Sequence, residues 1–386
     1  MISIKDKTQC CGCTACASIC PKEAIAMVPD AMGFKYPEVN ASKCIECGLC
    51  EKICAFNDNY DKSLNLHEPV IYAARHKNIH EIETSRSGAA FIAISDYVLD
   101  NGGIVYGVGY KDHFKVAHKR ATTKEERNEF KGSKYVQSDL DGIFRQVKED
   151  LKKGYTVLFS GTPCQTAGLN SYVGKKLREN LILIDIVCHG VPSPNIWKDY
   201  LTYFENKYKS KIIKVDFRDK SRIGWSGHIE SFVFENGNKI ESIIFKDLFF
   251  KHLISRPSCS VCHFANFNRP SDFTIGDYWG WNRISNDFNS DNKGCSLLFI
   301  NTERGLNHFK TISQALNLIK TTKTQCSQPN LLQPSEINKK FIEFISDYQK
   351  GGFRLILSKY SILSLNDIIR KRKRTLIKQI KNLFNK

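Results

Sequence analysis

The sequence lacks several features that would place it in common protein classes. No apolar run approaches the roughly twenty residues needed to cross a bilayer. No glycine-rich G-x-G-x-x-G loop follows a predicted strand, because Gly107-x-Gly109 is isolated. The first residues, Met1 to Asp6, do not resemble a secretory signal. These absences argue against a membrane-spanning or secreted protein and remove one common signature of nucleotide binding.

Motifs of nucleic-acid-binding domains are also missing, although the net charge is +17. Neither a helix-turn-helix nor an RNA-binding aromatic signature is present. Much of the positive charge is local, because it lies in residues 370–374 and in the lysines that follow them. Nucleic-acid binding is therefore kept only as a weak alternative function.

Cysteine, in contrast, is abundant, with 15 residues in a chain of 386. So many thiols without a secretory signal indicate a reducing compartment, and we expect a cytoplasmic protein. Two copies of the spacing C-x2-C-x2-C-x3-C lie within residues 10–54. This run is typical of bacterial two-cluster ferredoxins, in which the fourth cysteine of each run binds the other cluster. The spacing therefore predicts two 4Fe-4S clusters. Their ligands are Cys10, Cys13, Cys16 and Cys54 for the first, and Cys44, Cys47, Cys50 and Cys20 for the second.

Zinc knuckles and a disulfide framework are the alternatives for these cysteines. Zinc sites also use C-x2-C pairs, but they rarely repeat an eight-cysteine pattern with the x3 step. Disulfides suit small secreted domains, which this chain does not resemble. Residues 24–28 and 34–39, between the two runs, are predicted to form a short hairpin, which supports the ferredoxin interpretation. Cys11 has no place in the spacing and is predicted to be a bystander.

The rest of the chain is predicted to be an α+β protein. Residues 155–159 and 181–187 form apolar runs that are typical of strands buried on both faces of a parallel sheet. Antiparallel pairs are expected elsewhere, so the sheet is predicted to be mixed and partly parallel. Residues from 303 onward are predicted to be mostly helical. The expected divisions are a two-cluster ferredoxin domain (1–56), a linker (57–68), an α/β domain in two parts (69–150 and 151–310) and a helical C-terminal extension (311–386).

Four further cysteines form a second candidate metal site. Cys164 and Cys188 follow the two buried strands, at the edge where ligands bind in open α/β sheets, and Cys259 and Cys262 form a C-x2-C loop. Four thiolates that meet there would hold a third 4Fe-4S cluster. Zinc is an alternative, because all-cysteine tetrahedral sites bind it readily. Four ordinary buried thiols are the other alternative.

Several short motifs occur in an order that resembles one known family. They are residues 85–88 (SRSG), 132–138 (GSKYVQS), 160–169 (SGTPCQTAGL), 187–194 (VCHGVPSP), 217–220 (FRDK), 259–264 (CSVCHF) and 275–280 (IGDYWG). Together they resemble the coenzyme F-420 hydrogenase/dehydrogenase beta-subunit family over roughly residues 4–310. The resemblance is specific because several unrelated motifs recur in the same order.

The resemblance implies FAD, which the residues alone would not have indicated. Members of the family are flavoproteins that pass electrons between iron–sulfur clusters and a substrate or a deazaflavin coenzyme. Residues 69–310 would then form a flavin-binding domain, with loops and the helix start after Thr162 as candidates for holding the pyrophosphate. The candidate cofactor-binding residues are Ser85, Ser87, Gly88, Ser133, Lys134, Tyr135, Ser138, Ser160, Gly161 and Thr162. The candidate catalytic residues are His189, Arg218, Lys220 and Asp277, each with a purely structural role as its alternative.

These observations predict an iron–sulfur flavoprotein oxidoreductase that moves electrons between ferredoxin-type clusters and FAD. Its expected partner is an electron-carrier protein or a small redox substrate that the sequence does not identify. A non-catalytic electron-relay subunit is the alternative function. Residues 367–386 carry apolar side chains at mostly helical spacing between lysines and arginines, which predicts a basic amphipathic helix able to contact an anionic membrane surface. A solvated terminal helix is the alternative for this tail.

Overall fold

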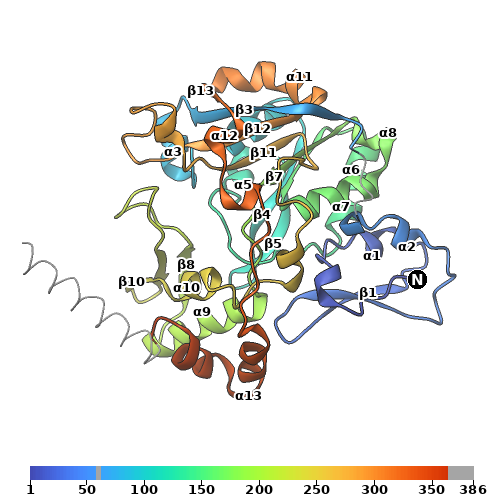
Figure 1. Ribbon diagram of the computed structural model, residues 1–386, viewed down its shortest axis with the longest axis vertical. Helices are drawn as coiled ribbons and strands as arrows, with labels where there is room; N and C mark the ends of the chain where they lie inside the picture. The colour runs from blue at the N-terminus through green and yellow to red at the C-terminus, as the bar shows by residue number, and fades with distance from the viewer. Residues whose placement is uncertain (58–61, 364–386) are drawn as a thin grey trace, which may run out of the picture.

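A mixed eight-stranded sheet forms the centre of the molecule (Figure 1). The computed structural model describes residues 1–57 and 62–363. In spatial order, the strands are β13 (Leu316–Thr321), β3 (Asn65–His76), β12 (Ser296–Thr302), β11 (Phe273–Asp277), β7 (Leu181–Ile186), β6 (Val157–Gly161), β4 (Ile104–Lys111) and β5 (Lys115–Ala121). Strands β11, β7, β6 and β4 run parallel, whereas the pairings on either side of them are antiparallel. The predicted mixed, partly parallel sheet is confirmed.

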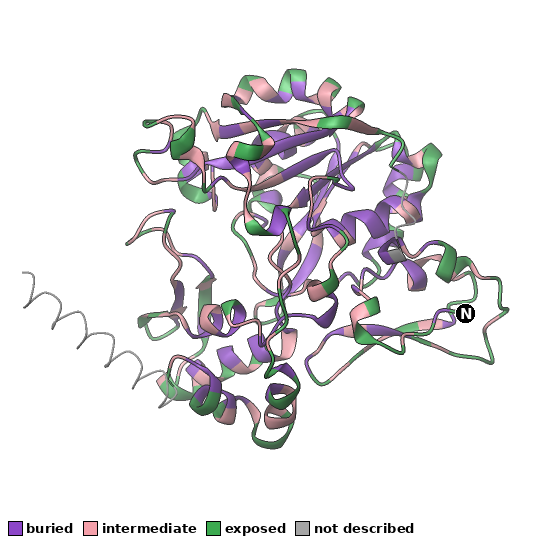
Figure 2. Cartoon of the chain, in the orientation of Figure 1, coloured by how far each residue is buried: buried purple, intermediate pink, exposed green. Residues whose placement is uncertain are grey.

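Helices cover both faces of the parallel strands, which explains why those strands are almost wholly apolar. Figure 2 shows the resulting buried centre. Side chains of α4 and α11 pack on one face of the sheet, and side chains of α6 and α7 pack on the other. These helices are α4 (Ala90–Asp100), α11 (Glu303–Ile312), α6 (Ile143–Lys152) and α7 (Pro163–Val173). Because Gly161 of β6 pairs with Asp185 of β7, the two strands end side by side.

A second, smaller layer is built on a three-stranded antiparallel sheet. Its strands are β8 (Ile212–Asp216), β9 (Glu230–Phe234) and β10 (Lys239–Ser242). Its helices are α9 (Pro194–Tyr208), α10 (Ile244–Phe250) and α13 (Phe341–Tyr360), which bends at Gly352. The core of this layer is aromatic, because Trp197 stacks on Phe217 at a centroid distance of 4.3 Å and Tyr200 lies against Phe232 at 5.5 Å.

The N-terminal module has the hairpin that the sequence predicts, formed by β1 (Ile25–Pro29) and β2 (Lys35–Val39). Each cysteine run contains one short helix, α1 (Ala15–Ile19) or α2 (Leu49–Lys52). Both helices begin after a residue with positive φ, which is 67° at Thr14 and 70° at Gly48. The duplicated spacing therefore corresponds to a duplicated local structure.

This module shares its hydrophobic core with the rest of the chain. Cys13 and Phe56 belong to the same buried cluster as Phe144 and Leu169, which lie beneath the large sheet. Gly168 of α7 is needed at this contact, because an added Cβ would lie 2.7 Å from the Cys13 sulfur. The hairpin packs on the second layer, where Met32, Phe34 and Tyr36 join its aromatic core. The module is therefore held in one orientation by packing on both layers.

Three segments differ from the sequence-based expectations. Leu316–Thr321 is strand β13 rather than helix, because it completes the edge of the sheet beside β3. Strand β3 begins at Asn65, inside the predicted linker. The sequence also predicts a strand over residues 239–245, but β10 ends at Ser242 and helix α10 begins at Ile244. The predicted amphipathic tail, residues 367–386, lies outside the described residues. Within the described ranges, no helix is both long and apolar enough to cross a bilayer.

Candidate functional site

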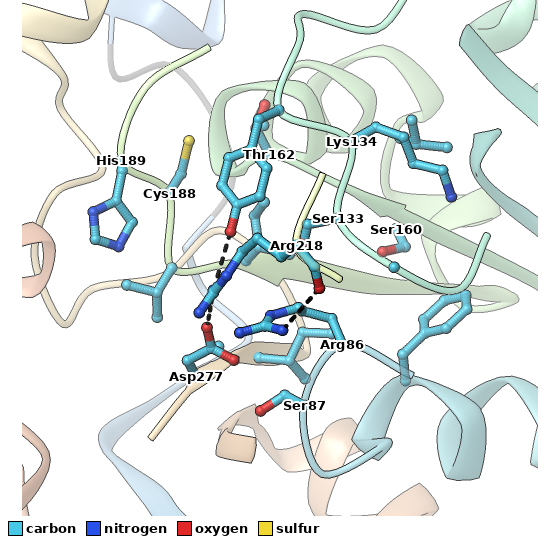
Figure 3. Close-up of a pocket in the computed structure, with 18 of the residues that line it drawn as sticks. Arg86, Ser87, Ser133, Lys134, Ser160, Thr162, Cys188, His189, Arg218 and Asp277 are labelled. Atoms are coloured by element: carbon cyan, nitrogen blue, oxygen red, sulfur yellow. Dashed lines mark hydrogen bonds and ion pairs between the residues drawn. The ribbon is translucent and has the colours of Figure 1, made fainter. Parts of the chain in front are cut away.

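A cavity of about 540 Å³ opens beside the carboxyl ends of β6 and β7, and it gathers most of the predicted cofactor residues (Figure 3). Side chains of the second layer, including Arg218 and His228, form its opposite wall. The predicted cofactor-binding residues that line it are Ser85, Ser87, Ser133, Lys134, Tyr135, Ser138, Ser160, Gly161 and Thr162. Three of the predicted catalytic residues line it as well, namely His189, Arg218 and Asp277. Segments that are far apart in the sequence thus meet at one site.

Two predicted residues lie outside this cavity for clear structural reasons. Gly88 packs against the sheet, and an added Cβ would lie 2.2 Å from the Ala74 carbonyl oxygen. Lys220 points away from the cavity and donates through its Nζ to the carbonyl oxygens of Ile82, at 2.7 Å, and Lys293, at 2.8 Å. Gly88 thus allows close packing on the sheet, and Lys220 attaches its loop to two neighbouring segments.

A buried histidine fixes the polar wall of the cavity. His118 is fully buried, with its Nδ1 3.0 Å from the Ser138 Oγ and its Nε2 3.0 Å from the Ser160 carbonyl oxygen. Burial lowers the pKa of His118 to about 4, so its imidazole is neutral near pH 7. Gln165 donates from its Nε2 to the same Ser138 Oγ at 3.0 Å. Sequence reasoning missed His118 because, in strand β5, it has no motif around it.

Two arginines and one aspartate form the opposite, charged wall. Arg218 donates from its Nη1 to the Asp277 Oδ2 at 2.6 Å and to the Tyr135 hydroxyl at 3.2 Å. Among the described residues, Arg86 donates to carbonyl oxygens, one of which is that of Arg218 at 3.2 Å. Burial by itself would raise the pKa of Asp277, but Arg218 and Arg86 hold it below its usual range. The single carboxylate thus serves two guanidinium groups.

The cavity wall carries an excess of positive charge. Burial and the neighbouring Arg218 lower the pKa of Arg86 to about 10, which leaves it charged at neutral pH. Burial, followed by Arg218 and Lys246, lowers the pKa of His228 to about 2, because a further positive charge is unfavourable there. An anionic group is the chemical complement of such a wall. Sequence reasoning did not identify Lys246 or His228, which reach the cavity from the second layer.

The second cysteine set meets around a small adjoining cavity of about 30 Å³. Its lining includes Cys164, Cys188, Cys259 and Cys262, as predicted. Burial, followed by repulsion from the other three sulfurs, raises the pKa of the Cys188 thiol. Buried thiols of this kind become thiolates when bound iron or zinc compensates their charge, so the donor set fits a metal group.

The described side chains do not form a site for a single metal ion. In the described parts of the chain, no three His, Cys, Asp or Glu side chains are arranged to hold one metal ion. A cubane cluster places its thiolates at four separate iron atoms, so its ligands do not need to converge on one point.

The loop after Cys262 is fixed by a buried ion pair. The Arg269 Nη2 donates to the Asp185 Oδ1 at 2.7 Å, and the Arg269 Nη1 donates to the Phe264 carbonyl oxygen at 2.6 Å. Ser271 donates to the Asp185 Oδ2 at 2.6 Å. Because Asp185 lies at the end of β7, these bonds attach the C-x2-C segment to the strand that leads to Cys188.

The N-terminal cysteines also gather in the predicted sets. Cys20, Cys44, Cys47 and Cys50 surround one shallow cavity near the N-terminus. Burial, followed by the neighbouring Cys13, Cys10 and Cys54, raises the pKa of the Cys16 thiol, so these four thiols lie within electrostatic reach of one another. The binding of each run's fourth cysteine to the other cluster stays a prediction.

Cys11 lies between the first of these sets and the second cysteine site. It is buried and lines the small cavity together with Cys164. The neighbouring Cys11, opposed by burial, lowers the pKa of Cys164 to about 7. The sequence spacing predicts a bystander here, because it gives no information on contacts with residues 150 positions away.

Two family models match the chain. Residues 154–325 match the model for the C terminus of the beta subunit of coenzyme F420 hydrogenase/dehydrogenase. The predicted family resemblance is confirmed. Residues 9–57 match the model of a 4Fe-4S dicluster domain, which confirms iron–sulfur ligation as the chemistry of the N-terminal module. The matched central region contains all four cysteines of the second set and most of the wall formed by Arg218 and Asp277.

One sequence relative and one solved structure are also similar to this chain. An uncharacterized polyferredoxin-like protein of Methanocaldococcus jannaschii is 30% identical over 66 residues, which cover 15% of this chain and 39% of that protein. This chain thus spans well under half of that relative's length. A chain of the F420-reducing [NiFe] hydrogenase complex from Methanosarcina barkeri is 19% identical, with a TM-score of 0.46, over 72% of this chain and 89% of that one.

We expect Cys188→Ser to remove about a third of the iron, because the second cysteine set would then lack one ligand of a third cluster. The two ferredoxin clusters should keep their electron paramagnetic resonance signals, since their ligands are separate. Cys326→Ser is the matched control, because Cys326 is a buried thiol outside all three sets. If Cys188→Ser retains all its iron, the four cysteines do not form one site.

Proposed function

We propose that the protein is an iron–sulfur flavoprotein oxidoreductase that binds FAD in the large cavity and exchanges electrons with it through three clusters. One observation carries the proposal: Cys188 lines both the small cavity of the second cysteine set and the large cavity. A cluster held by Cys188 would therefore adjoin any ligand in the large cavity. The family match supports this proposal, since it relates the chain to hydrogenases and dehydrogenases.

The proposed electron route follows the order of the cysteine sets. The set around Cys47 is the most accessible, because Cys47 itself is exposed and Ile45 beside it is 57% exposed. The set around Cys13 lies against α7, and Cys11 separates it from the second cysteine site. Electrons would travel along this series in either direction. When bound, a flavin supplies the conversion between one-electron and two-electron transfer.

The protein's own residues provide distinct contacts for a flavin nucleotide. The N-terminus of α7 follows Thr162, where backbone N–H groups favour a phosphate. Ser160 and Ser138 are held in place by His118 on the same side of the cavity. Arg86 and Arg218 would balance a negative charge on the cofactor or on an acidic substrate. A deazaflavin coenzyme and other redox substrates both fit this description.

A non-catalytic relay subunit is the second candidate function. The exposed apolar residues Met1, Ile45 and Leu49 beside the Cys47 set favour it, because they would suit contact with an electron-carrier protein. A cavity of about 540 Å³ beside the second cysteine set favours the enzyme, since a relay has no need for a substrate site. A cytoplasmic location remains part of the proposal.

Cofactor analysis of anaerobically purified protein tests the proposed function. We expect about twelve iron atoms, as much acid-labile sulfide and one FAD per chain, because three cubanes carry four irons each. If the analysis finds about eight irons and one zinc per chain, the second cysteine set holds zinc and not a third cluster. Protein rich in zinc, with little sulfide and no flavin, would refute the proposal.

We expect Arg86→Met to weaken FAD binding about tenfold, because a charge-assisted hydrogen bond to a partly buried anion contributes about 1.5–3 kcal/mol. Arg86 is the informative position because its loss leaves no buried carboxylate without a partner. Fluorescence titration of deflavinated protein would measure the affinity, with Lys148→Met, outside the cavity, as the control. Unchanged FAD affinity would contradict a contact between Arg86 and the flavin nucleotide.

A further inference from the structure

Arg256 is a buried arginine whose backbone belongs to the second cysteine site. It lies just before the short helix of Pro257–Val261, which carries Cys259. Its N–H donates to the Val191 carbonyl oxygen at 3.0 Å, and its own carbonyl oxygen accepts from the Cys259 N–H at 3.0 Å. Any movement of this backbone would therefore move Cys259 as well.

The side chain of Arg256, in contrast, reaches into the N-terminal module. Its Nε donates to the Cys10 carbonyl oxygen at 2.8 Å, and its Nη2 donates to the Lys35 carbonyl oxygen at 3.0 Å. The same Nη2 lies 3.7 Å from the Cys10 sulfur. The guanidinium also lies over the Tyr36 ring, 4.2 Å from its centroid. Arg256 is only 1% exposed, so these contacts are formed away from water.

The first cysteine loop is shaped to accept this guanidinium. Gly12 has a φ of +71°, and a Cβ there would lie 2.8 Å from the Arg256 Nη1. Gln137 completes the contact, because its Oε1 accepts from the Arg256 Nη1 at 2.9 Å and its Nε2 donates to the Cys11 carbonyl oxygen at 3.0 Å. Arg256 and Gln137 together hold the backbone of residues 10–12.

The contact with Cys10 has an electrostatic consequence for a cluster held there. Reduction adds one negative charge to a cluster and its thiolates, and hydrogen bonds to the ligand sulfurs stabilise that added charge. A cation in a buried position acts more strongly than it would in water. The guanidinium that lies 3.7 Å from the Cys10 sulfur has neutral oxygen atoms as its other hydrogen-bond partners.

We propose that Arg256 is a positioning residue that fixes the first ferredoxin cluster against the second cysteine site and raises the reduction potential of that cluster. The proposal rests on the iron–sulfur part of the proposed function and does not require FAD. Through its backbone and its side chain, Arg256 would connect the N-terminal module to the second cysteine site, which adjoins the large cavity at Cys188.

Arg145 provides a matched control at the same interface. It also joins the N-terminal module to the large sheet's helices, since its Nη1 pairs with the Glu23 Oε1 at 2.6 Å. Its remaining contacts are with the carbonyl oxygens of Ser18, at 3.4 Å, and Ala17, at 3.3 Å. Because Arg145 contacts no cysteine sulfur, its loss weakens the interface without removing a donor to a cluster ligand.

The test compares Arg256→Met with Arg145→Met in the anaerobic full-length protein by redox titration monitored by electron paramagnetic resonance. For Arg256→Met, we expect the equilibrium constant for reduction of one ferredoxin cluster to fall about tenfold, which is about 59 mV for one electron. The other ferredoxin cluster and both clusters of Arg145→Met should titrate as in the wild type. Hydrogen exchange of residues 10–16 should accelerate in Arg256→Met.

Several outcomes would overturn the proposal. One is an unchanged potential in Arg256→Met, and another is an equal shift in Arg145→Met. If Arg256→Met does not fold, Arg256→Lys decides, because an ammonium cannot bond the Cys10 and Lys35 carbonyl oxygens with the same planar geometry. Faster exchange of residues 10–16 is expected for that variant, and unchanged exchange and potential would refute the inference. A wild type without cubane signals would instead refute the proposed function.

Discussion

The parallel pairing of β6 with β7 is the constraint on which the functional site depends. Pairing Gly161 with Asp185 brings two strand ends to the same edge of the sheet. The two segments that follow carry Thr162 and Cys164 on one side and Cys188 on the other. The large cavity and the second cysteine set both begin at this edge, so one backbone feature places them next to each other.

The packing of the N-terminal module places its first cysteine loop next to the second cysteine set. The module shares one hydrophobic cluster with the large sheet and another with the aromatic second layer, so packing on both sides positions it. Gly168 allows Cys13 to approach α7, and Gly12 allows Arg256 to reach Cys10. Two glycines thus permit the close approach of the Cys10–Cys13 loop to the second cysteine site and to α7.

Sequence information predicted the features that are encoded locally. The repeated cysteine spacing predicted the 4Fe-4S dicluster module that the family model matches, because this module depends on a short, repeated loop and helix. Apolar runs located the parallel strands, and the motif order located the residues around the cavity. The edge strand β13 was missed because its burial depends on pairing with β3, about 240 residues earlier.

Residues that act through distant contacts were missed for a similar reason. The role of Arg256 depends on Cys10 and Lys35, and that of His118 depends on Ser138 and Ser160. No pattern in the neighbouring sequence records such contacts. The motif around Arg218 likewise could not show that Lys220 points to Ile82 and away from the cavity. Local sequence patterns thus identified the kinds of cofactor, whereas the structure was needed to identify which distant residues contact one another.

In the proposed function, the cysteine sets and the cavity form one intramolecular electron route. Anaerobic stopped-flow absorbance tests it most directly, by mixing the oxidised holoprotein with a low-potential one-electron reductant and following the cluster and flavin bands. We expect the clusters to bleach first and the flavin then to be reduced at a rate independent of protein concentration. Flavin reduction that requires collisions between molecules, or that precedes reduction of the clusters, would contradict it.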